Sequence, residues 1–147
     1  MRLALFLLLF PLCAGPLHAQ APDSTGTLVV IVTGFDVDDG IARIRLDTTA
    51  SAFAGEASEA SFARSTAVPI TDGEVVWTLN ALPWGQYAAS AYHDEDDDGS
   101  LNTNLFGAPS EPFGFSNDAR ARFGRPDFAE AAFRFAAPQD TVRFRVQ

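Results

Sequence analysis

The sequence predicts an all-β fold: an antiparallel two-sheet sandwich of about seven strands, with one long ordered loop. Short runs in which apolar residues alternate with a period of two recur along the chain, separated by Gly, Asp and Pro turns. No run keeps the 3.6-residue period of an amphipathic helix over several turns. Strands with one apolar face are buried when two sheets pack together, so we expect an immunoglobulin-like or prealbumin-like sandwich.

The first expected strand, Leu28 to Val32, is apolar on both faces and therefore central in its sheet. A turn at Asp38-Asp39-Gly40 leads to a second strand at residues 43–46, where Ile and Leu alternate with Arg. The stretch from Ser51 to Ala63 has no clear period, and we expect a loop or one or two helical turns there.

Five further strands follow the same alternation. They are expected at residues 65–70, 75–79, 87–93, 131–135 and 142–146. The first two of them flank the turn Asp72-Gly73 and suggest a hairpin. The segment from Glu95 to Phe128 separates the expected strand at 87–93 from the one at 131–135 and has no strand pattern. Long ordered loops in compact domains often carry function.

The N-terminus has the features of a cleaved signal peptide. Arg2 precedes an apolar run from Leu3 to Leu12, and Ala19 provides the small residue expected before a cleavage site. The run is too short to span a bilayer, which argues against a membrane anchor. We therefore expect a signal peptide at 1–19, a disordered lead at 20–26 and one β-sandwich domain at 27–147, exported to the periplasm or secreted.

The composition left after this cleavage excludes several classes of function. The 147 − 19 = 128 remaining residues have no cysteine, because Cys13 is the only one, and carry a formal charge of 9 − 19 = −10. Nucleic acids and anionic lipids need a basic face, so neither is an expected partner. The domain keeps a single histidine, His93, and has no recognisable nucleophile–base pair, so we expect no catalytic residues and no enzymatic activity.

A run of five acidic residues begins the long loop and fits the pattern D-x-D-x-D-G. Oxygen ligands at alternate positions before a turn-forming glycine are how the first half of a calcium loop wraps a hard cation. The expected metal ligands are Asp94, Asp96, Asp98, Ser100 and Asn102. Position twelve of an EF-hand is Leu105 in this chain, so one more ligand must come from elsewhere, with Asn104, Glu111 and Asp118 as candidates.

Charged and aromatic residues in the loop admit alternative roles. The acidic run is either solvated, neutralised by arginines or occupied by calcium. Arg120, Arg122 and Arg125 either hold an anion or form a charge network with these carboxylates. The loop phenylalanines either form an exposed ligand platform or close the end of the sandwich. They are Phe106, Phe113, Phe115, Phe123 and Phe128.

Four motifs stand out in and beside this loop: His93-Asp94-Glu95, Asn102-Thr103-Asn104-Leu105-Phe106-Gly107, Phe113-Gly114-Phe115-Ser116-Asn117 and Arg122-Phe123-Gly124. Together they resemble a family of secreted bacterial proteins catalogued as domain of unknown function 2141. The likeness runs from about Leu28 to Val146. The run Leu82-Pro83-Trp84-Gly85-Gln86-Tyr87 is also similar to transthyretin-like and carboxypeptidase-regulatory-like sandwiches. The resemblance implies an exported β-sandwich and brings no catalytic residues.

Three functions are therefore open. The first is a non-enzymatic module that binds an extracytoplasmic ligand or protein through the loop from Asp94 to Phe128, ordered by calcium or by arginines. The second is a hydrolase on a transthyretin-like sandwich. The third is a structural domain of the envelope, in which the loop only packs.

Overall fold

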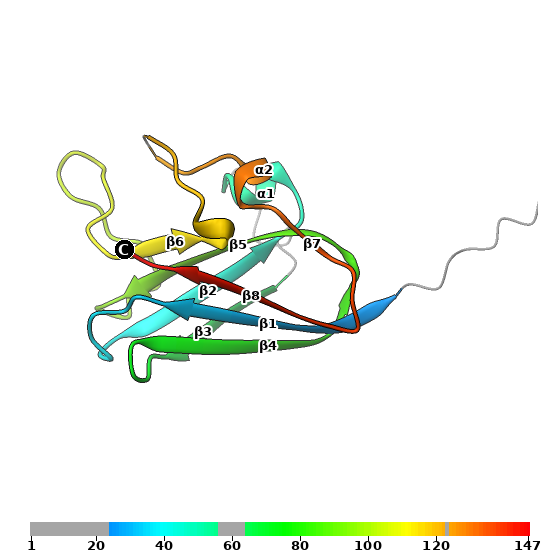
Figure 1. Cartoon of the computed structure of the whole chain (residues 1–147). Coiled ribbons are helices and arrows are strands. Elements are labelled where there is room, and N and C mark those ends of the chain that lie inside the picture. The colour runs from blue at the N-terminus through cyan, green and yellow to red at the C-terminus, as the bar shows by residue number, and fades with distance from the viewer. Residues whose placement is uncertain (1–23, 56–63, 123) are drawn as a thin grey trace, which may run out of the picture.

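The computed structural model describes residues 24–55, 64–122 and 124–147, which form a sandwich of two β-sheets (Figure 1). One sheet has three strands in the order β4-β1-β8, and the other has the order β3-β2-β5-β6, with β7 paired to β5. The strands are β1 (Thr25–Thr33), β2 (Ile41–Asp47), β3 (Arg64–Pro69), β4 (Glu74–Pro83), β5 (Gly85–Asp94), β6 (Phe113–Phe115), β7 (Phe133–Phe135) and β8 (Gln139–Arg145). The helical turns are α1 (Ala50–Phe53), η2 (Ser116–Asp118) and α2 (Phe128–Ala131).

The main core lies between the two sheets. Leu28, Val30 and Val32 of β1 are fully buried, as the alternation in the sequence predicts. They face Ala42, Ile44 and Leu46 of β2 and the alanines on the inward face of β5. On each strand the neighbouring residues point outward. On β2 the outward row therefore consists of Ile41, Arg43, Arg45 and Asp47.

The predicted fold class is confirmed, with two differences in strand pairing. All strand pairs are antiparallel except β1 and β8, which run parallel. The reason is that β8 starts at the same end of the sandwich as β1, where the Thr27 amide donates to the Pro138 carbonyl at 2.9 Å. The expected hairpin around Asp72-Gly73 is wrong, because β3 pairs with β2 and β4 pairs with β1. That turn is a corner between the two sheets.

The segment from Glu95 to Phe128 is more structured than its sequence suggests. It contains β6, which pairs with β5, and the 3-10 turn η2. With α1 and α2 these elements form a second apolar cluster on the outer face of the five-stranded sheet (Figure 1). Its buried members are Phe53, Ala88, Phe115 and Ala131. Phe113 and Phe128 pack against it, so these loop phenylalanines mainly close the structure.

Gly114 lies where β6 crosses closest to β8. A side chain at this position would overlap the carbonyl oxygen of Arg145. Next to it, the backbone groups of Phe113 and Gln147 form two hydrogen bonds, of 3.3 and 3.1 Å. The two sheets therefore meet along this edge.

Two expectations concern the N-terminal part of the chain. Residues 1–23, which include the expected signal peptide, lie outside the described residues. Strand β1 begins at Thr25, two residues before the expected start of the domain. In the part of the chain that the structure describes, no helix is long and apolar enough to cross a membrane.

Candidate functional site

The acidic turn follows β5 directly and is held by that strand. On β5, His93 points into the core, whereas the next residue, Asp94, lies on the outer face beside Arg43 of β2. Both side chains are fully buried. The strand alternation thus turns the imidazole of His93 toward the core and the carboxylate of Asp94 toward the outer face of the sheet.

Asp94 anchors the turn. Its Oδ1 accepts the Asp98 amide at 3.1 Å, and its Oδ2 accepts the Gly99 amide at 3.0 Å and the Nε of Arg43. Burial opposes ionisation of this carboxyl, but the hydrogen bond and charge of Arg43 and the two amides outweigh it. They hold the pKa of Asp94 below its usual value. Asp94 is therefore a carboxylate at any pH near neutrality.

Glu111 is a second buried carboxylate and lies in the middle of the loop, two residues before β6. Its Oε1 accepts the Glu95 amide at 2.9 Å and its Oε2 accepts the Asn102 amide at 2.8 Å. One oxygen atom each from Asp94, Asp96 and Glu111 lie within 4.8 Å of one another. Of the three extra ligands that the sequence offered, Glu111 is thus the one brought to the acidic turn.

The rest of the turn is held by hydrogen bonds among its own residues. The Ser100 amide donates to Asp98 Oδ1 at 2.7 Å, and the Asn102 side chain donates to Asp96 Oδ2 at 3.0 Å. Gly99 has a φ of 86°, which lets the chain turn back over Asp94. Alternate carboxylates followed by a carboxylate from a distant position are the ligand set that suits calcium.

The other two candidates for an extra ligand have different roles. Asn104 caps a hairpin, because its Oδ1 accepts the amides of Phe106 at 2.9 Å and Ala108 at 3.2 Å. Asp118 lies in η2, where its Oδ1 accepts the Arg145 amide at 2.9 Å. Neither belongs to the converging carboxylates.

Among the described residues, the arginine that pairs with the acidic run is Arg43, which the sequence analysis did not single out. Besides Asp94, it binds Asp97 Oδ1 through Nη2 at 2.8 Å. The alternation of β2 already placed Arg43 on the outer face, but only the pairing of Arg43 with Tyr92 of β5 brings it beside the turn. Since Arg43 offers one positive charge, most of the negative charge of Asp94 to Asp98 has no cation from the described residues within ion-pair distance.

The three loop arginines do not form one site. Arg120 lines a pocket of about 350 Å³ between β6 and residues 118–121, 124 and 126. Arg122 is exposed. Arg125 lies over the rings of Phe53 and Phe115, at 5.0 and 5.1 Å, and donates to the Phe53 carbonyl at 2.7 Å. Burial against these rings, with repulsion from Arg45, lowers the pKa of Arg125.

A buried ion pair was also missed in the sequence. Asp47 and Arg45 lie two residues apart on the outward row of β2, with Oδ2 and Nε at 3.0 Å. Asp47 is fully buried, and its Oδ1 has no hydrogen-bond partner among the described residues. Burial raises the pKa of Asp47, although Arg45 opposes the shift. Arg45 also donates to the Ala52 carbonyl at 3.0 Å, so this pair fastens α1 to the sheet.

The imidazole ring of His93 is fully buried in the core. Its Nε2 lies 2.6 Å from the Asp39 carbonyl oxygen, and its ring packs edge-on against Phe35. No described residue forms a hydrogen bond with Nδ1, which lies 3.9 Å from Glu95 Oε1.

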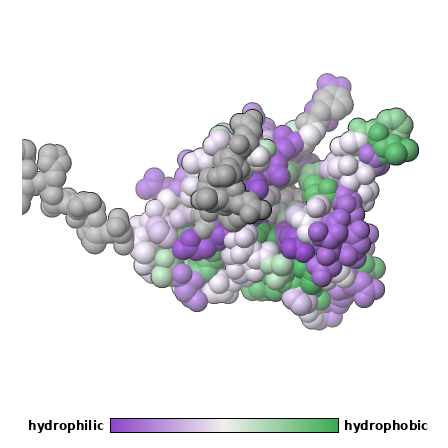
Figure 2. Space-filling view, turned by 180° about the vertical axis from the view of Figure 1, so that it is seen from behind, coloured by the Kyte–Doolittle hydropathy of each residue, from purple (hydrophilic) through white to green (hydrophobic). Residues whose placement is uncertain are grey.

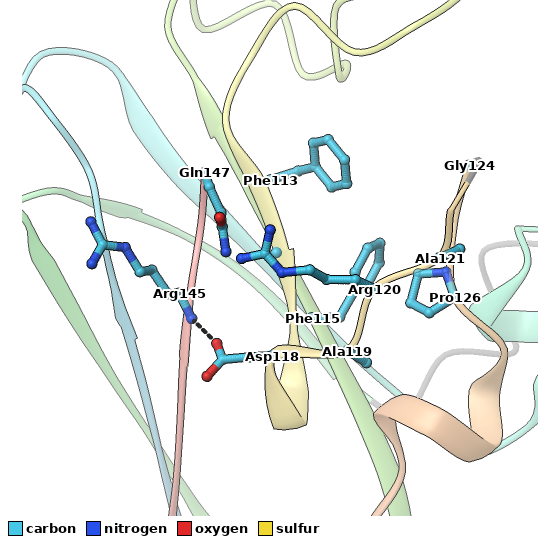
Figure 3. Close-up of a pocket in the computed structure, with 11 residues that line it drawn as sticks. Phe113, Phe115, Asp118, Ala119, Arg120, Ala121, Gly124, Pro126, Arg145 and Gln147 are labelled. Atoms are coloured by element: carbon cyan, nitrogen blue, oxygen red, sulfur yellow. Dashed lines mark hydrogen bonds between the residues drawn. The ribbon is translucent and has the colours of Figure 1, made fainter.

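The pocket lined by Arg120 lies beside the last residues of the chain (Figure 3). Phe113 and Phe115 form one wall, and Ala121 and Pro126 lie on the other side. Arg120 extends across it toward Gln147. Asp118, Arg145 and Gln147 also line the pocket, which therefore has both apolar and polar walls.

Comparison with known proteins identifies the family. Residues 30–143 match the model of a family described as uncharacterized protein conserved in bacteria, DUF2141, and the chain belongs to this family. This confirms the resemblance seen in the sequence motifs. No curated protein matches the chain. No solved structure matches it either.

Proposed function

We propose that this member of the DUF2141 family is an exported, non-enzymatic binding module in which a calcium ion orders the loop from Asp94 to Phe128. The ligands are the carboxylates of Asp94, Asp96 and Asp98, with Ser100 and Asn102 following in the turn and Glu111 closing the site. Export rests on the N-terminal sequence, and it places the loop where calcium is more abundant than in cytoplasm.

The observation that carries this proposal is the position of Glu111. Two buried carboxylates, Asp94 and Glu111, approach each other and Asp96 closely enough to share one ion. Like charges at such distances repel strongly unless a cation lies between them or a proton binds. Arg43 contacts Asp94 but has no ion pair with Glu111 or Asp96. A divalent ion with several oxygen ligands fits this arrangement, and calcium accepts more carboxylates than magnesium does.

The non-enzymatic part of the proposal is supported by the placement of the reactive side chains. His93 faces the core, whereas Asp94 and Arg43 face the opposite side of the sheet. A hydrolase needs a nucleophile, a base and an orienting group within hydrogen-bond reach of one another. The described residues around the loop do not combine in this way.

Thermal unfolding in calcium and in chelator tests the proposal. A ligand at 100 times its Kd stabilises the folded state by about 2.7 kcal/mol. For a domain of about 120 residues, 1 kcal/mol corresponds to about 4 °C in Tm, so calcium is expected to raise Tm by about 11 °C. Titration calorimetry then gives the affinity, and magnesium is expected to produce a smaller shift.

Glu111→Gln and Glu95→Gln form a matched pair of variants. Each removes one negative charge from the same loop, but only Glu111 belongs to the converging carboxylates. We expect Glu111→Gln to lose the calcium-induced rise in Tm and Glu95→Gln to keep most of it. An equal loss in both variants would mean that calcium only screens the net charge. A wild-type protein whose Tm ignores calcium would refute the proposal.

A further inference from the structure

A groove lies on the outer face of the five-stranded sheet, over β3, β2 and β5. Its volume is about 380 Å³, which falls in the range of small-molecule sites. Leu101 and Arg125 reach it from the long loop, and its other lining residues belong to the three strands. The space-filling view from behind, which is the side of this sheet, shows apolar patches between strongly hydrophilic regions (Figure 2). We call this cavity the sheet groove.

The register of the strands explains why the sheet is hollow here. Arg45 of β2 lies between Ser65 of β3 and Ser90 of β5, and Ala67 of β3 lies beside Arg43. Residues opposite one another on paired strands share a face, so small side chains stand next to the long arginine side chains. Neither serine hydroxyl forms a hydrogen bond with another described residue, so both remain available to a ligand.

The sheet groove is basic, although the chain is strongly acidic. Arg43, Arg45 and Arg125 line it, and none of its described lining residues carries a carboxylate. The whole chain has a formal charge of −9. A local excess of positive charge in a concave site favours negatively charged ligands.

Arg125 is the arginine that is placed to hold such a ligand. Arg43 and Arg45 already pair with the carboxylates of Asp94 and Asp47. Arg125 forms no ion pair with the described residues. Its Nη1 donates to a backbone carbonyl of α1, whereas its Nε and Nη2 donate to none of the described residues. A guanidinium edge of this kind binds the two oxygen atoms of a carboxylate through two parallel hydrogen bonds.

Aromatic rings hold Arg125 in position. Its guanidinium lies over the rings of Phe53 and Phe115, at 5.0 and 5.1 Å. Stacking of this kind fixes the guanidinium plane and uses none of its N–H groups. Burial and repulsion from Arg45 lower the pKa of Arg125, so its surroundings disfavour the positive charge and an anion would compensate it. A cation that is held in place without a counter-charge is preorganised for an anionic ligand.

We propose that the sheet groove binds a small organic carboxylate. The carboxylate pairs with the Nε and Nη2 edge of Arg125, and the apolar body of the ligand lies against Tyr92 and Leu101, which line the same groove. A phosphate group, with a charge of about −1.5 to −2, suits the groove less. The reason is that Arg43 and Arg45 are already neutralised by carboxylates of the chain.

This inference rests on the proposed function in one respect, because it names a ligand class for the binding module. The sheet groove itself does not depend on calcium. None of its described lining residues is among the proposed calcium ligands. Binding of the carboxylate is therefore expected in chelator as well as in calcium.

Titration of the ¹⁵N-labelled protein with phenylacetate in chelator, followed by amide chemical shifts, tests the inference. Phenylacetate has about ten non-hydrogen atoms, so we expect a millimolar Kd. The shifts should centre on Ser90 and Tyr92. Acetate lacks the apolar body and phenethylamine has a cation in place of the carboxylate, so both are expected to bind at least about tenfold more weakly.

Two pairs of variants assign the site. Arg125→Gln should weaken phenylacetate binding at least about tenfold, whereas the control Arg143→Gln, on the exposed face of the other sheet, should not change it. Ala67→Phe places a ring in the sheet groove at an exposed position and should abolish binding. The control Ser51→Phe places the same ring in a neighbouring pocket that Arg125 also lines, and it should leave the affinity unchanged.

Four results would overturn the inference. They are shifts that do not saturate or do not cluster at the groove, equal weakening by both arginine variants, loss of binding in Ser51→Phe but not in Ala67→Phe, and inorganic phosphate that binds as tightly as phenylacetate. If Arg125→Gln fails to fold, Ala67→Phe still decides, because its position is exposed. A protein that binds phenylacetate but whose Tm ignores calcium would refute the calcium site alone. A protein that shows the reverse would refute the carboxylate site alone.

Discussion

Ser116 is the residue through which the loop is fastened to the sandwich, and its hydroxyl gives the sharpest prediction of stability. Its Oγ accepts the Ala89 amide of β5 at 2.9 Å and donates to the Ala131 carbonyl of α2 at 2.6 Å. All three residues are fully buried, so water does not replace the hydroxyl when it is removed. The variant Ser116→Ala thus leaves one amide and one carbonyl without this partner.

The cost can be worked out from these two contacts. An orphaned buried donor costs about 1–3 kcal/mol, and a lost neutral hydrogen bond costs about 1 kcal/mol, so the expected loss is about 2–4 kcal/mol. At about 4 °C per kcal/mol for a domain of this size, Tm falls by about 8–16 °C. Differential scanning calorimetry in chelator measures the change without a contribution from calcium.

Ser110→Ala is the control for this substitution. Ser110 is exposed on the hairpin and uses its backbone amide in a hydrogen bond to Asn102, so a change within about 0.5 kcal/mol is expected. If Ser116→Ala lowered Tm by less than about 3 °C, the hydroxyl would not be a structural anchor. The assignment of β6 and η2 as fixed parts of the fold would then be in question.

Two further substitutions test the electrostatics of the outer face. Arg43→Gln removes the partner that keeps the pKa of Asp94 low; the stability from this carboxylate exists above its unfolded pKa and is lost as pH falls through the folded value. The acid-unfolding midpoint of Arg43→Gln, measured by melts at several pH values, should therefore move to higher pH. Without the competing cation, calcium should bind about 2–10-fold more tightly, which titration calorimetry measures. Unchanged values in both measurements would contradict this reasoning. Asp47 has a raised pKa, so its favourable contribution is complete below its unfolded pKa and declines as pH rises through the folded value. Asp47→Asn is expected to match or exceed the wild-type Tm at pH 7 and to lose that advantage near pH 4; an equal deficit at both pH values would show that the ion pair with Arg45 dominates.

The sandwich itself was predictable because it depends on local patterns. Alternation marks Leu28, Val30 and Val32 as core residues whatever strand lies beside them. The pairing of strands is not local. The turn Asp72-Gly73 is suited equally to a hairpin and to a corner, and the choice depends on which sheet has room for β4. For the same reason, the parallel pairing of β8 with β1 has no signature in either strand.

The candidate site was predictable only in its first half. Asp94, Asp96 and Asp98 form a contiguous pattern, so the spacing alone points to a cation. Glu111 lies well beyond the EF-hand position and was one of three candidates, and its selection requires the return of the chain through the hairpin to β6. Arg43 is more distant still in sequence, and only the register between β2 and β5 brings it to Asp94. The strand β6 is short and starts after Pro112, which hides its alternation.

Glu111 gives the loop a property that neither half of the sequence pattern contains. Its two oxygen atoms accept the amides of Glu95 and Asn102, which lie at the start of the acidic turn and at the base of the hairpin. The carboxylate therefore closes the turn into a ring through hydrogen bonds within the chain. An ion bound to Asp94 and Asp96 would lock this ring, which is how we expect calcium to order the loop. Calcium should accordingly raise Tm while leaving the circular dichroism spectrum at low temperature nearly unchanged. A large gain of β-structure on adding calcium would mean instead that the ring of hydrogen bonds forms only when Glu111 binds the ion.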